Sequence, residues 1–335
     1  MKKNYIFYCV CLIHIIFSAC KVPNSISQYN DKEVWQNIHY NINENILQTD
    51  TAFLMVSNRI FDANKKAFAE ENIDTHSVHY LYISKSDTVW NVHEIKTLEE
   101  GIKRMPNKNW VLYTEGMGKI FTNNMERAYL MSNTYHVNVI LFDYASINSQ
   151  LSILKNYYFS YHNAVNSAKQ YYHFLKNIQQ LKESTSLFAN KKVSIFLHSM
   201  GNLVFQKMIK NQAMASELNR IKFIDNIIFN AADVNRKNHN RWIGNIEFAK
   251  NIIINYNTSD TKLMMAMLIS GNRKMGSKPL RPYARNADYT NLHKEVGNNH
   301  SYFLNIPNRT FRMNEKVKIY FEKILNGQAL KEKDF

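Results

Sequence analysis

A serine lies where the sequence changes from a strand pattern to a helix pattern. Residues 193–197 are apolar apart from one serine, as in a buried parallel strand, and residues 202–218 carry apolar side chains at helical spacing without a proline. Ser199 and Gly201 fall in the turn between them. A serine at such a corner is exposed at the end of a strand, and the N–H of Met200 begins a helix, where it can stabilise an oxyanion. The pattern therefore favours a nucleophilic serine.

The residue two positions before the serine departs from the usual Gly-x-Ser-x-Gly pattern. Leu197 stands where a small residue is usual, so we expect its side chain to crowd the turn. An ordinary strand–helix turn that happens to carry a serine would give the same five residues. Whether Ser199 does chemistry therefore depends on partners elsewhere in the chain.

A serine hydroxyl needs a base to take its proton and an acid to orient that base. At a corner of this kind the usual chain order is serine, acid, histidine. Of the two histidines after Asp260, we favour His300, in a turn-forming run, over His293, in a solvated segment. Asp260 follows the second predicted strand after the serine and is the favoured acid. Asp233 follows the first and is the alternative acid, or a cap or turn residue, and His198 is predicted to be a packing residue.

The oxyanion site needs two N–H donors. Met200 should supply one, and the turn after the predicted buried strand at 110–114 should supply the other, through Gly116 or Met117. Glu115 precedes them, where many hydrolases have histidine. A carboxylate near a developing oxyanion is unfavourable unless it points away. Glu115, like the leucine before the serine, therefore favours a protein that keeps the fold but binds rather than catalyses.

The elements that must position these residues alternate from residue 110 onward, strand then helix. This alternation indicates an α/β fold with a mostly parallel central sheet and helices on both faces. Active sites of such sheets lie outside the carboxyl ends of the strands. Ser199, Asp233, Asp260 and the turn at 115–118 all follow predicted strands. That coincidence is the strongest sequence argument for chemistry.

The sequence shows no internal repeat and no clear domain boundary. One domain over residues 51–330 is the simplest organisation. Within it we expect a hairpin over 79–92, an aromatic loop over 144–162, and long helices over 163–182 and 202–218.

Composition excludes several other classes of function. The 335 residues are 45% hydrophobic, enough for a large α/β domain with a real core. The formal net charge is +15, but the lysines are scattered and no nucleic-acid-binding motif occurs, so we expect no nucleic-acid partner. No compact His/Asp ligand motif is present, and we expect neither a metal nor another cofactor. The oligomeric state is not predicted.

Residues 1–19 resemble a bacterial lipoprotein signal peptide. A positive N-terminus precedes an apolar stretch at 5–17 that is short for a membrane span, and Cys20 follows two small residues. In such signals the cysteine is lipidated and becomes the new N-terminus; an ordinary secretory signal or a short anchor is the alternative. Residues 20–50 are polar and are predicted to be a tether. We therefore expect a bacterial cell-envelope protein, facing the periplasm or the surface and held to the membrane by lipid on Cys20.

Six short runs, in chain order, resemble a bacterial family of α/β-hydrolases of unknown function. The runs at 198–202 (His-Ser-Met-Gly-Asn) and 300–303 (His-Ser-Tyr-Phe) are the most specific. The resemblance implies the α/β-hydrolase fold and a triad of Ser199, Asp260 and His300, but no substrate. The remaining runs lie at 56–59, 141–146, 225–233 and 259–260.

We therefore predict a membrane-anchored serine hydrolase, most simply an esterase or lipase-like enzyme acting on a small-molecule or lipid ester. Ser199 would attack the ester carbonyl, His300 would relay the proton, and Asp260 would orient His300. The alternative is a weak or inactive protein of the same fold that serves as a binding or envelope module.

Overall fold

The computed structural model describes residues 38–41, 49–64, 66–307 and 309–330. The predicted signal peptide and Cys20 lie outside these residues, as does most of the predicted tether. Within the described ranges, none of the helices combines the length and the apolar character that crossing a membrane requires.

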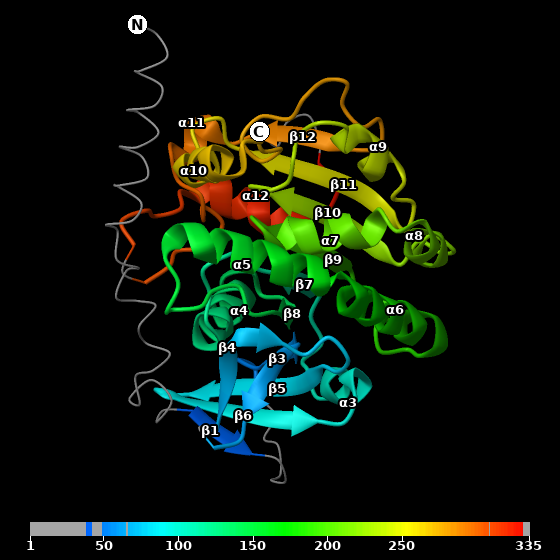
Figure 1. Ribbon diagram of the computed structural model, residues 1–335. Coiled ribbons are helices and arrows are strands. Elements are labelled where there is room, and N and C mark those ends of the chain that lie inside the picture. The colour runs from blue at the N-terminus through cyan, green and yellow to red at the C-terminus, as the bar shows by residue number, and fades with distance from the viewer. Residues whose placement is uncertain (1–37, 42–48, 65, 308, 331–335) are drawn as a thin grey trace, which may run out of the picture.

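The described strands form one large sheet and one small sheet. The small sheet pairs β3 (Arg59–Asp62) with β4 (Ala67–Ile73). The large sheet has ten strands in the order β1-β6-β5-β2-β8-β7-β9-β10-β11-β12 and runs from the bottom to the top of Figure 1. Its strands are β1 (Ile38–Asn41), β2 (Phe53–Ser57), β5 (His79–Ser86), β6 (Val89–Ile95), β7 (Trp110–Thr114), β8 (Asn138–Asp143), β9 (Val193–His198), β10 (Ile224–Asn230), β11 (Ala249–Tyr256) and β12 (Asp288–Asn291).

All pairings of the large sheet are parallel except those that β5 makes with β2 and β6. From β2 to β12 every neighbouring pair is parallel, so these strands end at one common edge, on the left in Figure 1. The predicted mostly parallel α/β fold is thus confirmed. The antiparallel β5–β6 hairpin is confirmed as well, and its connection is tight enough to put Ser86 opposite Val89.

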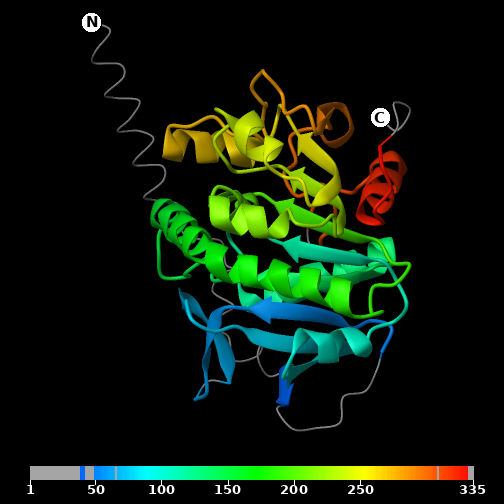
Figure 2. The same cartoon turned by 90° about the vertical axis from the view of Figure 1, so that its right-hand side faces the viewer.

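Helices cover both faces of the large sheet. Helices α5 to α8 lie on one face, whereas α4 and α12 lie on the other, as the view in Figure 2 makes clear. The helices are α3 (Leu98–Lys103), α4 (Phe121–Tyr135), α5 (Ile153–Asn166), α6 (Ala168–Ser184), α7 (Gly201–Ile209), α8 (Gln212–Leu218), α9 (His239–Gly244), α10 (Thr261–Ser270), α11 (His293–Val296) and α12 (Glu315–Leu325).

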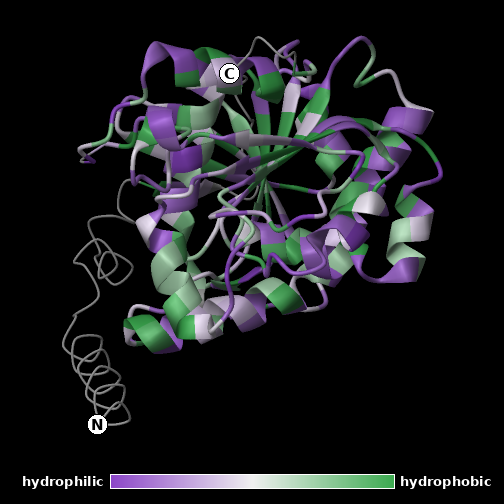
Figure 3. Cartoon of the chain, turned by 90° about the horizontal axis from the view of Figure 1, so that it is seen from above, coloured by the Kyte–Doolittle hydropathy of each residue, from purple (hydrophilic) through white to green (hydrophobic). Residues whose placement is uncertain are grey.

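Two apolar cores follow from this layering. Side chains alternate across a strand, so successive residues of β7 enter different cores: Trp110 and Leu112 lie on the α5–α8 side, and Val111 and Tyr113 on the α4–α12 side. Both sides are buried, and the central strands are therefore apolar almost throughout. Seen from above in Figure 3, the strands at the centre are mostly hydrophobic, while the surrounding loops carry most of the hydrophilic residues.

Two expectations about the N-terminal half differ from the structure. Residues 38–41, inside the predicted tether, form β1 and pair in parallel with β6, so the sheet begins before residue 51. The predicted aromatic loop contains the helix α5. The buried face of this helix carries Asn156 and Ser160, which form hydrogen bonds to the loop before the helix. Because these buried residues are polar, the sequence lacks the helical spacing of apolar residues that predicts a helix.

The predicted helix over 202–218 is two helices. The α7 helix ends at Ile209, and Asn211 starts α8 by accepting the N–H of Met214 on its side-chain oxygen at 3.3 Å. Asparagine competes for the backbone in this way and so favours a new N-cap over a continuing helix.

Candidate active site

Ser199 occupies the corner between β9 and α7 in a left-handed conformation, with φ of 51°. This conformation is costly for a residue other than glycine and persists only where the surroundings enforce it. Here the Ser199 N–H donates to the carbonyl of Asn230 at 3.0 Å, and its carbonyl accepts the N–H of Asp233 at 3.0 Å. The side-chain amide of Asn202 donates to the same carbonyl at 2.9 Å. The strained serine is thus fixed from both sides.

Two glycines allow the corner to form. A Cβ on Gly201 would lie 2.5 Å from the carbonyl oxygen of Thr114, so only glycine lets α7 start this close to β7. A Cβ on Gly116 would lie 2.5 Å from the Cβ of Ser199 and 2.9 Å from the nitrogen of Met200. The turn after β7 therefore lies directly against the serine and the start of α7.

Leu197 does not take up the space beside the serine. Its side chain is fully buried in the core on the α5–α8 side, together with Leu203 and Val204 of α7. The backbone at Ser199 adopts its left-handed corner with this leucine in place. The residue that limits room at the corner is Gly116.

Asp260 and His300 are in direct contact. The His300 Nδ1 lies 2.7 Å from Oδ2 of Asp260, and the carboxylate is fully buried, whereas the imidazole is 15% exposed. The other carboxylate oxygen accepts the N–H of Leu263 at 3.0 Å and so caps α10. The loop that carries the histidine is held by Asn257, whose amide donates to the carbonyls of Gly297 and Asn299. Sequence analysis missed this asparagine.

Asp233, the alternative acid, is engaged elsewhere. Its Oδ1 lies 2.7 Å from Nζ of Lys274, which donates to the hydroxyl of Tyr157 at 2.8 Å. Both charged side chains are 5% exposed. Burial by itself lowers the pKa of Lys274, but the neighbouring carboxylate outweighs it and the pKa is raised. Of the two aspartates, only Asp260 contacts His300.

The turn after β7 has only one of its two predicted oxyanion donors free. The Gly116 N–H donates to Oε1 of Glu115 at 3.0 Å. In the described part of the chain, neither the N–H of Met117 nor that of Met200 is bonded to another group. Met117 and Met200 are therefore the N–H pair that remains for an oxyanion beside Ser199.

The carboxylate of Glu115 is buried, and it neither reaches solvent nor pairs directly with Lys119. It accepts the hydroxyl of Tyr113 and lies 3.8 Å from Nη1 of Arg127 and 3.7 Å from Nε2 of His198. Burial alone would raise the pKa of Glu115, but the cations Lys119 and Arg127 and the hydrogen bond from Tyr113 lower it below the usual range. The negative charge of Glu115, which sequence analysis took as unfavourable for an oxyanion nearby, is thus balanced by cations within the protein.

His198, next to the serine, links the two halves of the site. Its ring centroid lies 4.7 Å from that of His300 and 4.8 Å from that of Phe303. Its two nitrogens lie 3.2 Å from the amide of Asn230 and 3.4 Å from the hydroxyl of Ser301. Burial lowers the pKa of His198 well below its ordinary value, so the imidazole is neutral at pH 7. His198 therefore packs against its neighbours, as expected, and also forms polar contacts with them.

A buried ion pair supports the turn after β7. The Arg59 Nε lies 2.8 Å from Oδ2 of Asp143, and both side chains are fully buried. The Nη2 group of this arginine donates to the carbonyls of Lys119 at 2.9 Å and Tyr144 at 2.8 Å. The guanidinium thereby fastens the two loops that follow β7 and β8. Sequence analysis assigned this arginine no role; Arg59 appeared there only within the run at 56–59.

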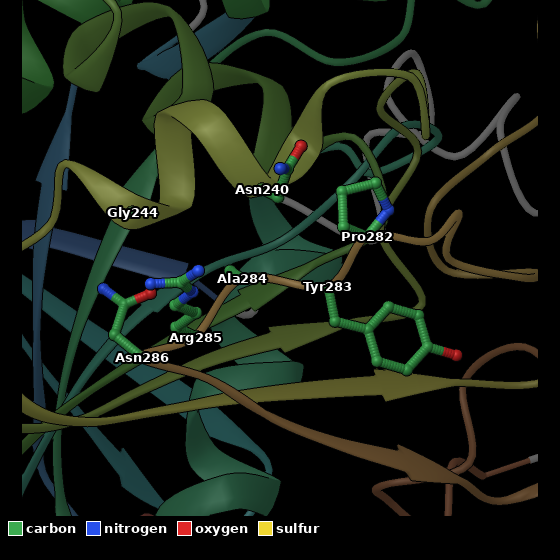
Figure 4. Close-up of a pocket in the computed structure, with 7 residues that line it drawn as sticks. All are labelled: Asn240, Gly244, Pro282, Tyr283, Ala284, Arg285 and Asn286. Atoms are coloured by element: carbon green, nitrogen blue, oxygen red, sulfur yellow. The ribbon is translucent and has the colours of Figure 1, made fainter.

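A separate cavity of about 430 Å³ opens beside α9 (Figure 4). None of the predicted site residues lines it. Among the described residues, no group of three or more His, Cys, Asp or Glu side chains is arranged to hold a metal ion. The cavity is lined by Asn240, Gly244, Pro282, Tyr283, Ala284, Arg285 and Asn286.

A strained serine between a strand and a helix, an aspartate–histidine pair at the same edge, and a mostly parallel sheet together define a protein of the α/β-hydrolase class. Comparison with protein families agrees. The family described as alpha/beta hydrolase of unknown function (DUF900) matches residues 91–313, about two thirds of the chain, and the chain belongs to this family. Neither a curated protein nor a solved structure matches the chain.

Proposed function

We propose that this α/β hydrolase cleaves carboxylic esters with a triad of Ser199, His300 and Asp260. The observation that carries the proposal is the 2.7 Å contact between His300 and buried Asp260 at the edge where the strained serine lies. The carboxylate occupies Nδ1 and leaves Nε2 of the imidazole to accept a proton.

The reaction follows from these roles. The Ser199 Oγ attacks the ester carbonyl as His300 Nε2 takes its proton, and the carbonyl oxygen becomes an oxyanion held by the N–H groups of Met117 and Met200. His300 then gives the proton to the leaving alcohol as the C–O bond breaks, which leaves an acyl-serine. Water, deprotonated by the same imidazole, attacks the acyl group, and the imidazolium returns this proton to Ser199 Oγ as the acyl C–O bond breaks, which releases the acid and the free serine.

The N-terminal sequence supports a membrane anchor as part of this proposal. Lipid on Cys20 would hold the enzyme at the bacterial envelope, next to lipid or small-molecule esters. Changing Cys20→Ser should release the protein from the membrane fraction or block its processing, as seen by fractionation and mass spectrometry. A native chain whose mature N-terminus lies beyond residue 20 would rule the anchor out.

Hydrolysis of short p-nitrophenyl esters tests the catalytic proposal. The Ser199→Ala variant should lose about four to six orders of magnitude in turnover. Ser301→Ala is the matched control, because this serine lies near His300 in sequence but has no assigned step. Equal rates for the wild type and Ser199→Ala, with both folded, would refute the assignment and leave the binding-module alternative.

A further inference from the structure

The helix α10 presents an unusually apolar outer surface. Its only buried residues are Leu263 and Ala266. Met264 is 51% exposed and Leu268 is 52% exposed. These two side chains are four residues apart and so lie on the same face of the helix. Large apolar side chains that gather on a surface mark a site of interaction with another apolar body.

The neighbouring helix α5 extends this apolar surface. Its Tyr158 is 46% exposed, and the hydroxyl donates to the carbonyl of Ile269 in α10 at 3.3 Å. The two helices lie side by side at the left of Figure 1, at the edge where the parallel strands end. We call Tyr158, Met264 and Leu268 the α10 surface. Because Asp260 caps α10, this surface adjoins the candidate active site.

Three stretches of the chain that include α5, α10 and the loop after α11 carry cationic side chains and no acidic ones. Residues 144–182, 261–287 and 296–314 contain no aspartate or glutamate, but they contain four, six and two lysines or arginines, respectively. Two of these, Lys155 and Lys262, are exposed in the first turns of α5 and α10. Such a combination of apolar and cationic side chains is typical of surfaces that meet anionic lipid.

One further lysine lies in the turn after β7, beside the candidate oxyanion donors. The Lys119 Nζ donates to the carbonyl of Met117 at 3.3 Å. Burial is the main reason that the pKa of Lys119 is lowered to about 8; the carboxylate of Glu115 opposes this shift, and the positive charges of Arg127, Arg309 and Lys262 add to it.

We propose that the α10 surface is a docking surface for a lipid bilayer with anionic headgroups. Met264, Leu268 and Tyr158 would enter the boundary between headgroups and acyl chains, and Lys155 and Lys262 would meet the headgroup anions. Docking in this way turns the active-site edge toward the bilayer. The proposal does not depend on Ser199 acting as a nucleophile, because the surface exists whether or not the site is catalytic.

Oxidation of methionines by peroxide tests this docking in the full chain. Met264 should be oxidised about fivefold or more slowly with vesicles of phosphatidylcholine and phosphatidylglycerol than without vesicles, since a thioether inside the bilayer boundary is shielded. Met105, partly exposed beyond α3, is the internal control and should keep its rate. Peptide mass spectrometry reads both residues in one sample.

Two pairs of variants separate the apolar and the charged contributions. Leu268→Asp should remove the protection of Met264, whereas Ile319→Asp should not; Ile319 is equally apolar and 56% exposed, but lies on α12. Lys262→Glu should weaken the protection, whereas Lys318→Glu on α12 should not.

Three outcomes would overturn the proposal. The first is an unchanged Met264 rate with anionic vesicles. The second is equal protection by vesicles of phosphatidylcholine alone, which would remove the role of the anionic headgroup. The third is protection that rises with protein concentration in the absence of lipid, which would assign the α10 surface to a second copy of the chain.

Discussion

Asp260 bonds to His300 with one carboxylate oxygen and to the start of α10 with the other. The His300 Nδ1 lies 2.7 Å from Oδ2, and the N–H of Leu263 donates to Oδ1 at 3.0 Å. A carboxylate fixed at both oxygens cannot turn away from the imidazole, so the ring keeps one orientation and one tautomer. The rigid start of a helix thus positions the base of the proposed reaction.

The first prediction separates the two aspartates. Asp260→Asn retains an oxygen that can cap α10 but disturbs the tautomer of His300, so turnover should fall about ten-thousandfold. Asp233→Asn should leave Lys274 buried without its partner and reduce the free energy of unfolding by about 3–5 kcal/mol, with little change in the turnover of the folded protein. Ester hydrolysis and urea unfolding of both variants measure this. A larger loss of turnover in folded Asp233→Asn would transfer the acid to β10.

The second prediction concerns Glu115. Glu115→Gln keeps an oxygen for the Gly116 N–H but leaves Arg127 without its buried counter-charge, so the free energy of unfolding should fall by about 3–5 kcal/mol. Glu99→Gln removes a partly exposed carboxylate that pairs with Lys103 on the surface of α3, and should change it by less than about 0.5 kcal/mol. Urea unfolding of the three proteins compares them. If Glu115→Gln were as stable as the wild type and more active, the carboxylate would be a defect of the oxyanion site and not a support for its turn.

The third prediction concerns pH. Burial depresses the pKa of His198 in the folded protein, so below pH 6.5 the unfolded chain binds a proton that the folded chain does not. The free energy of unfolding should therefore fall with decreasing pH below 6.5, by up to about 1.4 kcal/mol per pH unit from this one group. His198→Gln should reduce that slope. Urea unfolding between pH 5 and 7 measures it; parallel pH profiles for both proteins would mean that His198 is protonated in the fold.

Much of the fold could be predicted because buried parallel strands are apolar and their order alternates with helices. The elements that escaped prediction lack these signals. The strand β1 has only Ile38–Asn41 and gains its stability from pairing with β6, which a local pattern cannot reveal. Helix α5 escaped because Asn156 and Ser160 are buried for hydrogen bonding, not for apolar packing.

The contact between Asp260 and His300 could be predicted from residue types and their order in the chain, as could the corner at Ser199; the triad itself stays a prediction. The ion pairs around the candidate site could not be predicted in this way. The buried partner of Glu115 is Arg127, which comes from α4, and no local spacing relates the two. Lys274 likewise reaches Asp233 from a different loop. Long-range ion pairs of this kind depend on the completed fold.

The most direct test of the central claim is covalent labelling by a fluorophosphonate probe, followed by peptide mass spectrometry. Such probes react with a serine that a neighbouring base has activated. We predict one adduct on the wild-type chain, on Ser199, the same adduct on Ser301→Ala, and none on Ser199→Ala. A folded wild-type protein that takes no label, or a label that persists in Ser199→Ala, would contradict the assignment of Ser199 as the nucleophile.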